Sequence, residues 1–195
     1  MGYVKNKIKE LSAEAGSKKK ARSNAESWYN SSLRDRSVKE AKYTRSRFQP
    51  GKIYVFGYDP ITENLEWFDR NPIVLALEQV DDNDLGVNLN LLPIRVKEDL
   101  LDDLYQRTEG QIKSASTGSK FYNATAQSGL RITYQGMKAY LKRSGCDFAI
   151  RQYKPNRKRN QATVTYSKWP DIALCDFISL NGATIGQIRS MFSNR

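Results

Sequence analysis

Three strand-like segments between positions 52 and 91 constrain the fold of this chain more than any other feature. Lys52–Tyr58 is rich in β-branched and aromatic residues, and Ile73–Val80 is almost continuously apolar after Pro72. Leu85–Leu91 alternates apolar and polar residues with a period of two. Because these patterns are typical of strands that pack against a core, we expect an antiparallel meander, with a hairpin over 59–68 between its first two members.

Helical and extended segments follow this meander. An apolar stripe after Pro93 predicts a helix that ends near Gly110, and a second stripe predicts a helix over 130–144. Strands are expected at 148–153 and 162–166, and the spacing of Thr184 and Gln187 predicts a capped helix near the end. The expected fold is α+β, a small antiparallel barrel-like sheet with peripheral helices.

Residues 1–49 are expected to form a long basic N-terminal arm on a single α+β domain of residues 50–195. The arm begins with a helical stripe, continues through a flexible basic linker over 16–23, and holds few apolar residues. Such a segment cannot bury enough surface to offset its backbone entropy, so we expect it to order only on a partner. Removing residues 1–48 should then leave a folded domain. The expected partner anchors are Val4, Ile8, Leu11, Trp28 and Tyr43.

Charge falls into three blocks. Residues 1–50 hold thirteen Lys/Arg and five Asp/Glu, residues 51–110 hold five and thirteen, and residues 111–195 hold fourteen and three, within a net charge of +11. Clustered cations favour a polyanion, because neutralised phosphates release counterions, although acidic protein surfaces suit them equally well. The candidate nucleic-acid or partner contacts are Lys18, Lys19, Lys20 and Arg22, then Lys154, Arg157, Lys158 and Arg159, and on one helix Arg131, Lys138 and Lys142.

Several kinds of catalytic site are excluded or disfavoured. The chain has no histidine, which removes Ser–His and Cys–His nucleophiles and the commonest metal ligand. Cys146 and Cys175 stand in apolar surroundings and are expected to be buried free thiols. The run Asp81–Asp84 lacks the ligand pattern of a calcium loop and is expected to be a solvated turn. We therefore expect no enzymatic activity, metal or cofactor. The alternative is a metal-dependent nuclease that uses Asp59, Glu63, Glu66 and Asp69.

The central stretch resembles a known family. The order PGKIYVFGYDP, LEWFDRNPIVLALE and DLGVNLNLLP, followed by a leucine-rich helix, is similar to virion proteins of contractile-tailed bacteriophages, the DNA end protector or head-completion proteins. The resemblance covers Pro50 to about Tyr105, with a weaker match over 168–177. Two positions depart from the pattern: Asn71 stands where an aromatic residue is expected, and Pro170 replaces a polar helix or turn residue.

The resemblance implies a non-enzymatic structural protein in the virion of a tailed phage. It implies assembly in the host cytoplasm, a place near the head–tail junction with portal, neck or tail subunits as partners, and basic segments that contact the ends of double-stranded DNA. The alternative is a tail or baseplate assembly protein whose basic arms dock on acidic neighbouring subunits. No membrane partner is expected, since no stretch approaches the roughly 18 apolar residues of a membrane span.

Overall fold

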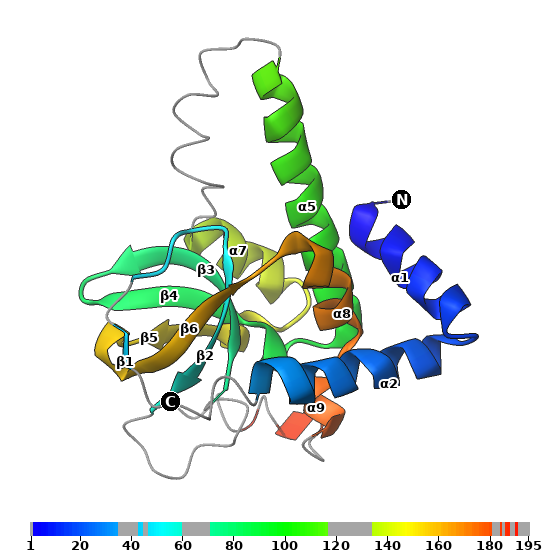
Figure 1. Ribbon diagram of the computed structural model, residues 1–195. Coiled ribbons are helices and arrows are strands. Elements are labelled where there is room, and N and C mark those ends of the chain that lie inside the picture. Colours follow the sequence, from blue (N-terminus) through cyan, green and yellow to red (C-terminus); the bar gives the residue numbers. More distant parts are fainter. Residues whose placement is uncertain are drawn as a thin grey trace.

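The computed structural model describes residues 2–34, 43–44, 47–59, 71–116, 134–180, 184, 186–187 and 190 of the 195-residue chain. These residues form a strongly curved antiparallel sheet with helices gathered on one of its sides (Figure 1). The hairpin expected over 59–68 and the anchor side chain of Tyr43 lie outside what is described.

All strand pairs in the sheet are antiparallel. The order across the sheet is β1 (Tyr43–Thr44), β6 (Lys158–Val164), β2 (Ile53–Tyr58), β3 (Ile73–Val80), β4 (Asn83–Asn88) and β5 (Ile150–Tyr153). The expected strands β2 and β3 are confirmed, and β4 is shorter than expected because residues 89–91 turn into the 3-10 helix η2 (Leu89–Leu91).

The sheet curls without closing. Strands β5 and β6 are separated by three strands in the sheet, yet only Lys154 and the 3-10 turn η4 (Pro155–Arg157) join them in the chain. So short a connection requires the two ends of the sheet to approach one another. Within the described ranges β5 and β6 form no ladder, so the expectation of a barrel-like sheet is wrong. The curl is instead bridged by side chains, because Asp84 of β4 pairs with Lys158 of β6.

The two faces of the sheet carry two separate cores, which follow the period-two alternation of strands. Ile53, Val55 and the odd-numbered residues of β3 from Ile73 to Leu77 face the main core, beneath the helices. Tyr54 and Phe56 face the opposite way, into a smaller aromatic cluster inside the curl. The members of this inner core are Phe48, Tyr54, Phe56, Val74, Ala76 and Tyr153, with Tyr58 at its margin.

The helices cover the main core. They are α1 (Tyr3–Glu14), α2 (Lys18–Trp28), α5 (Ile94–Ser116), α7 (Tyr134–Lys142), α8 (Trp169–Leu174) and α9 (Phe177–Leu180), with the π-helical turn η1 (Tyr29–Arg34) after α2 and the 3-10 turns η3 (Asp147–Ala149) and η5 (Tyr166–Lys168). Helix α5 is the longest, and α1, α2 and α8 pack together along its first half (Figure 1). It continues through Gly110, so the expected stop at that residue is wrong.

The N-terminal segment packs on its own chain. Val4 and Ile8, expected to anchor a partner, are 0% and 5% exposed and belong to the main core, while Leu11 and Trp28 are half-buried against it. The expected flexible linker over 16–23 is wrong, because Ser17 caps helix α2 by accepting a hydrogen bond from the backbone N–H of Lys20 at 3.2 Å. The behaviour of this segment in an assembly stays a prediction.

Packing also crosses the expected boundary at residue 49. Phe48 stacks on Tyr54 in the inner core with 4.9 Å between ring centroids, and Arg47 pairs with Asp84 of β4. Removing residues 1–48 would therefore take side chains out of both cores, which argues against the expectation that the remainder folds unchanged.

Residues that depart from the family pattern fit their positions. Pro170 lies in the first turn of α8, where its missing N–H has no intrahelical partner to lose. The backbone carbonyl of Asn71 accepts hydrogen bonds from the Tyr29 hydroxyl and the Asn90 amide, both at 3.2 Å, and β3 begins two residues later at Ile73. Thr184 and Gln187 exchange the reciprocal hydrogen bonds of a capping box, as expected.

Candidate nucleic-acid interface

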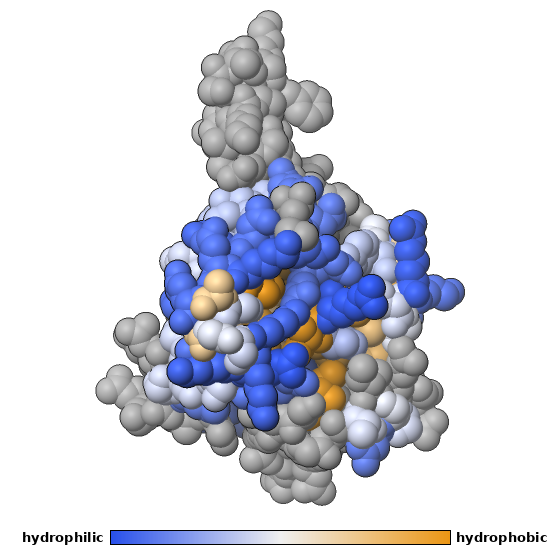
Figure 2. All heavy atoms as spheres, turned by 90° about the vertical axis from the view of Figure 1, so that its right-hand side faces the viewer, coloured by the Kyte–Doolittle hydropathy of each residue, from blue (hydrophilic) through white to orange (hydrophobic). Residues whose placement is uncertain are grey.

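The first basic group lies on helix α2 rather than on a linker. The side chains of Lys18, Lys19 and Lys20 are exposed in the first turn, and Arg22 is half-buried. Lys18 pairs with Glu98 of α5 at 2.9 Å, which leaves Lys19 and Lys20 as the outward cations. The face formed by α1 and α2 is mostly hydrophilic, and the most hydrophobic residues show between hydrophilic ones (Figure 2).

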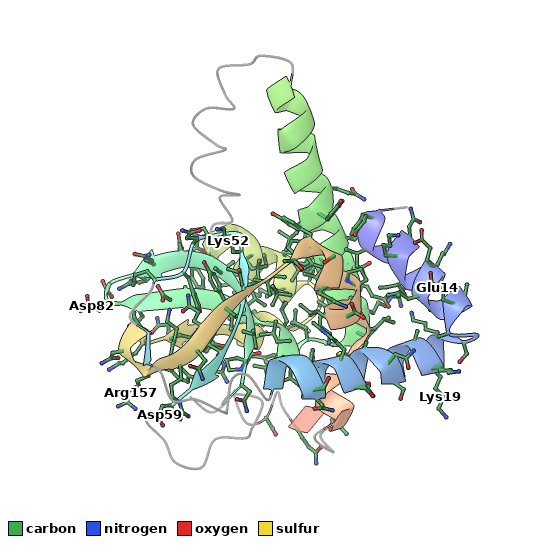
Figure 3. The ribbon with its side chains drawn as sticks, viewed as in Figure 1. Glu14, Lys19, Lys52, Asp59, Asp82 and Arg157 are labelled. Atoms are coloured by element: carbon green, nitrogen blue, oxygen red, sulfur yellow. The ribbon has the colours of Figure 1, made fainter. Side chains whose placement is uncertain are left out.

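The second basic group lies at the other end of the molecule. Lys19 and Arg157 point outward on opposite sides in Figure 3. Lys154 is exposed, and its backbone N–H donates to the Tyr58 hydroxyl at 3.2 Å. Arg157 is half-buried and donates to the carbonyl of Asp59 at 3.3 Å. These contacts fix the β5–β6 connection to the end of β2, so its cations have a defined place.

Lys158 does not belong to the surface. Its side chain is 0% exposed, its ammonium donates to Asp84 at 2.6 Å, and it lies 4.1 Å from the ring centroid of Phe48. Burial lowers the pKa of Lys158, and the neighbouring Asp84 carboxylate partly offsets that effect. The structure therefore corrects the expectation of a phosphate contact here, because the ammonium is occupied and out of reach.

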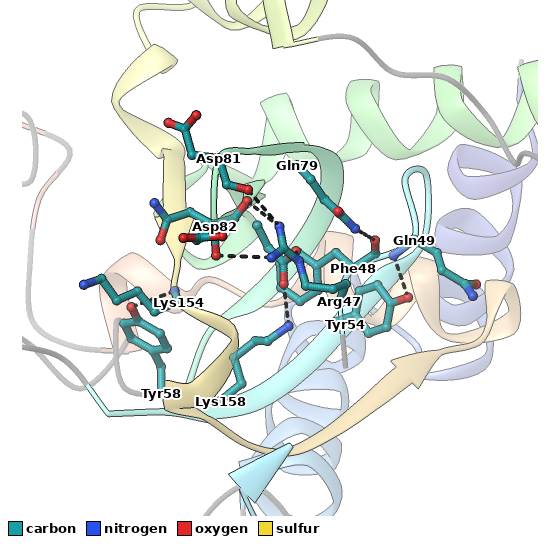
Figure 4. A network of polar contacts seen from close by, with 12 residues as sticks. Arg47, Phe48, Gln49, Tyr54, Tyr58, Gln79, Asp81, Asp82, Lys154 and Lys158 are labelled. Carbon is teal, nitrogen blue, oxygen red and sulfur yellow. Dashed lines mark hydrogen bonds and ion pairs between the residues drawn. The ribbon is translucent and has the colours of Figure 1, made fainter. Parts of the chain in front are cut away.

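Arg47 and Lys158 belong to one polar network inside the curled sheet (Figure 4), and both side chains pair with Asp84. One carboxylate oxygen accepts from Lys158 of β6, and the other accepts from Arg47 Nε at 2.9 Å. The guanidinium of Arg47 also donates to the carbonyls of Asp82 and Asn83, at 3.3 and 3.2 Å. The acidic turn is thus solvated at Asp81 and Asp82 but not at Asp84, which bridges β4 to β6 where the backbone ladder is open.

The third basic group lies on helix α7. Lys138 and Lys142 are exposed, as is Arg143 immediately after the helix, whereas Arg131 lies outside the described residues. Lys138 Nζ is 5.5 Å from the ring centroid of Tyr134, one turn earlier. The backbone N–H of Tyr134 donates to Glu78 of β3 at 3.2 Å, which ties the start of α7 to the sheet.

A pocket of about 740 Å³ opens between α7 and the edge of the sheet. It has apolar and aromatic walls and carries two cations, Lys138 and Arg151, with one carboxylate, Asp147. The lining residues are Val80, Leu85, Tyr134, Lys138, Gly145, Asp147, Phe148, Ile150, Arg151 and Gln152. Sequence reasoning selected Lys138 but missed Arg151 and both aromatic residues, because they come from separate elements whose pairing no local pattern reveals.

Lys97, Cys146 and Cys175 are buried in the core and do not line the pocket. Lys97 is fully buried on α5, donates to the backbone carbonyl of Cys175 and lies 4.3 Å from the ring centroid of Phe177. Burial lowers the pKa of Lys97 to about 8 and raises the pKa of the Cys175 thiol to about 12. Cys146 and Cys175 are buried free thiols, as expected.

The described part of the chain offers neither a metal-binding cluster nor a membrane-spanning helix. No group of three or more His, Cys, Asp or Glu residues there is arranged to hold a metal ion. No helix there combines the length and apolar composition needed to cross a bilayer. Of the carboxylates in the nuclease alternative, Asp59 is described, while Glu63, Glu66 and Asp69 lie outside the described residues.

Comparison with known proteins identifies the family. No curated protein and no solved structure gave a significant match to the chain. A family model described as "Phage T4 terminal DNA protecting protein" matches residues 2–181, which include the N-terminal helices, the curled sheet and the pocket. Because the match spans nearly the whole chain, this protein belongs to the family of phage terminal DNA protecting proteins.

Proposed function

We propose that this protein is a non-enzymatic structural component of a tailed-phage virion that binds and protects the ends of the packaged DNA. Its place is the head–tail junction, as a head-completion or neck protein beside portal or tail subunits, after assembly in the host cytoplasm. The observation that carries the proposal is a group of exposed cations beside the pocket, in a family described as protecting terminal DNA.

The positions of these cations support contact with a nucleic acid. Lys142 and Arg143 lie in the chain between two pocket-lining positions, Lys138 and Gly145, and Lys154 follows Gln152 by two residues. The side chains of Lys138, Lys142, Arg143 and Lys154 are exposed, and that of the pocket-lining Arg151 is half-buried. Cations that neutralise phosphates contribute affinity that falls steeply with salt, so an exposed group of this kind suits a polyanion.

Exonuclease protection tests the proposal. Purified protein should slow digestion of a linear duplex by an end-dependent exonuclease, and linear DNA should compete better than the same DNA as a closed circle. Protection should weaken as salt rises, because counterion release contributes to binding. If linear and circular DNA compete equally, or if protein does not slow digestion at low salt, the protein does not protect ends.

Two matched double variants test which basic surface contacts the DNA. Lys142→Gln with Arg143→Gln removes two cations near the pocket, and Lys19→Gln with Lys20→Gln removes two from α2. We expect the first pair to lower the salt slope of binding by about 2 and the second to leave it nearly unchanged. Equal losses would show that net charge, rather than the surface around α7, holds the DNA.

A second candidate function is docking on acidic neighbouring subunits, and an aromatic surface favours it. Tyr166 is the most exposed large hydrophobic residue among those described, at 46%, and it lies 4.7 Å from Trp169 and 6.0 Å from Tyr105 between ring centroids. Exposed aromatic residues commonly serve as interface anchors. Tyr166→Ser should then reduce incorporation into particles while leaving exonuclease protection unchanged; the reverse result would favour DNA contact at this surface.

A further inference from the structure

We propose that the pocket between α7 and the edge of the sheet binds the terminal nucleotide of a DNA strand, with its base against the aromatic walls and its phosphate at the two cations. This inference rests on the proposed function, because it assigns the contact that would distinguish a DNA end from the interior of a duplex.

The walls of the pocket suit a flat, partly apolar group. Tyr134 comes from the first turn of α7, Phe148 from η3 and Ile150 from β5, while Val80 and Leu85 contribute from the β3–β4 hairpin. A volume of about 740 Å³ falls within the roughly 300–1,000 Å³ of small-molecule sites. Aromatic side chains bind any nucleobase by stacking, since every base offers a π-face.

The charges suit a phosphate joined to that base. Lys138 stands over the Tyr134 ring at 5.5 Å, so its ammonium lies beside an aromatic wall. Arg151 lines the pocket from β5, opposite Gly86 of β4 in the ladder. A guanidinium can hold two phosphate oxygens at once, which a lone ammonium cannot. Asp147 and Gln152 supply polar groups that can hydrogen-bond a base edge.

The combination argues against simpler ligands. An inorganic anion would not require Phe148 and Ile150, and an acyl chain would not require two cations.

A pocket with both aromatic walls and cations also favours the end of a DNA strand over the interior of a duplex. Bases within a duplex are stacked and paired, and extracting one costs free energy that a frayed terminal nucleotide largely avoids. A concave pocket that accepts one nucleotide would therefore select termini.

Titration of the full chain with mononucleotides tests the pocket. We expect dAMP and dTMP to bind more tightly than the matching nucleosides without phosphate and more tightly than inorganic phosphate. Nuclear magnetic resonance should show shifts at Tyr134, Phe148 and Arg151. A response to phosphate alone that equals the response to dAMP would overturn the assignment of a base site.

Matched variants separate the pocket from general charge. Lys138 lines the pocket, whereas Lys9 is an exposed lysine on α1 that does not. We expect Lys138→Gln to weaken dAMP binding about tenfold and Lys9→Gln to leave it within twofold. Phe148→Leu keeps an apolar side chain and should weaken dAMP binding about fivefold or more, through lost stacking. Equal effects of the two lysine variants would overturn the proposal.

The outcomes also distinguish this inference from the proposed function. If linear DNA is protected but dAMP does not bind, ends are held elsewhere and only the pocket assignment fails. If dAMP binds at the pocket but linear DNA is not protected, the proposed function fails while the pocket remains a nucleotide site. Loss of exonuclease protection in Lys138→Gln, with protection kept in Lys9→Gln, would show that the pocket and the end-protecting site are the same.

Discussion

The carboxylate of Asp102 accepts a hydrogen bond from the backbone N–H of Val4, 98 positions earlier in the chain, at 2.9 Å. Asp102 is buried on α5, and the N–H of Lys5 points to the same oxygen at 3.4 Å. A carboxylate at the N-terminus of a helix satisfies free N–H groups and complements the helix dipole. Helix α1 is therefore attached to the body at a defined point rather than resting on it loosely.

Asp102→Ala should release the start of α1. We expect a loss of about 1–2 kcal/mol in the free energy of unfolding, typical of a removed helix cap, and faster hydrogen exchange at the amides of Val4 and Lys5. Asp99→Ala is the matched control, since Asp99 pairs with Lys5 at 2.7 Å but is half exposed, and it should cost less than about 1 kcal/mol. Equal losses in urea denaturation would show that Asp102 is not a cap.

Lys158→Met should destabilise the curled sheet by about 3 kcal/mol, because Asp84 would remain buried and, among the described residues, would keep Arg47 alone as an ion-pair partner. Lys154→Met, four residues earlier and exposed, should change the free energy of unfolding by no more than about 0.5 kcal/mol. Urea denaturation of both variants measures the difference. A Lys158→Met protein as stable as Lys154→Met would mean that Lys158 is solvated.

Gly86→Ala should be destabilising, because a Cβ at this position would lie 2.2 Å from Val74 Cγ1 and 2.9 Å from the carbonyl oxygen of Leu75. Overpacking of this kind costs about 1–3 kcal/mol. Adding Val74→Ala should restore part of the loss by removing the nearer contact, and Gly186→Ala, whose nearest neighbour is at 3.9 Å, should be nearly neutral. Thermal unfolding of the three proteins checks this; a double variant less stable than Gly86→Ala would exclude steric conflict with Val74.

The pH dependence of stability should report the burial of Lys97. Its pKa falls from 10.5 to about 8 on folding because burial disfavours the ammonium. Between pH 8 and 10.5 the unfolded chain binds the additional proton, so the contribution of Lys97 to stability rises with pH. Below pH 8 both states are protonated and the full cost of burying the charge is present.

Comparison with Lys97→Met isolates this effect from Cys175, whose raised pKa lowers stability above about pH 9 in both proteins. From pH 7 to pH 9 the wild type should gain roughly 1 kcal/mol relative to Lys97→Met in urea denaturation. Lys9→Met retains Lys97 and should follow the wild-type profile. Parallel profiles for wild type and Lys97→Met would show that Lys97 is not desolvated.

Much of the fold followed from local patterns in the sequence. The bounds of β3, the end of β2 at Tyr58, the helical stripe of α1 and the capping box at Thr184 were all predicted, because each depends on residues within about one turn or one strand. The resemblance of the central stretch pointed to the family that the full-length comparison shows. These features needed no knowledge of which segments meet.

The errors arose where distant residues meet. The sequence predicts Lys158 to be a surface cation and Asp84 to be part of a solvated turn, since polar residues follow Lys158 and precede Asp84. Their burial depends on the curl that brings β4 and β6 together across 74 positions. The contact between Val4 and Asp102 likewise joins residues far apart in the sequence. The walls of the pocket also come from separate elements, namely α7, the β3–β4 hairpin and β5.

The sequence by itself therefore determined the strands of the central meander, the helices α1, α5 and α7, and the family, because periodicity and capping act over a few residues. Only the tertiary structure decided which cations face solvent and which are held in the core. Burial and charge pairing depend on neighbours in space, and a lysine carries the same local pattern whether an aspartate approaches it across the sheet or not. Lys138 is exposed at the pocket, whereas Lys158 is buried inside the curl beside Asp84.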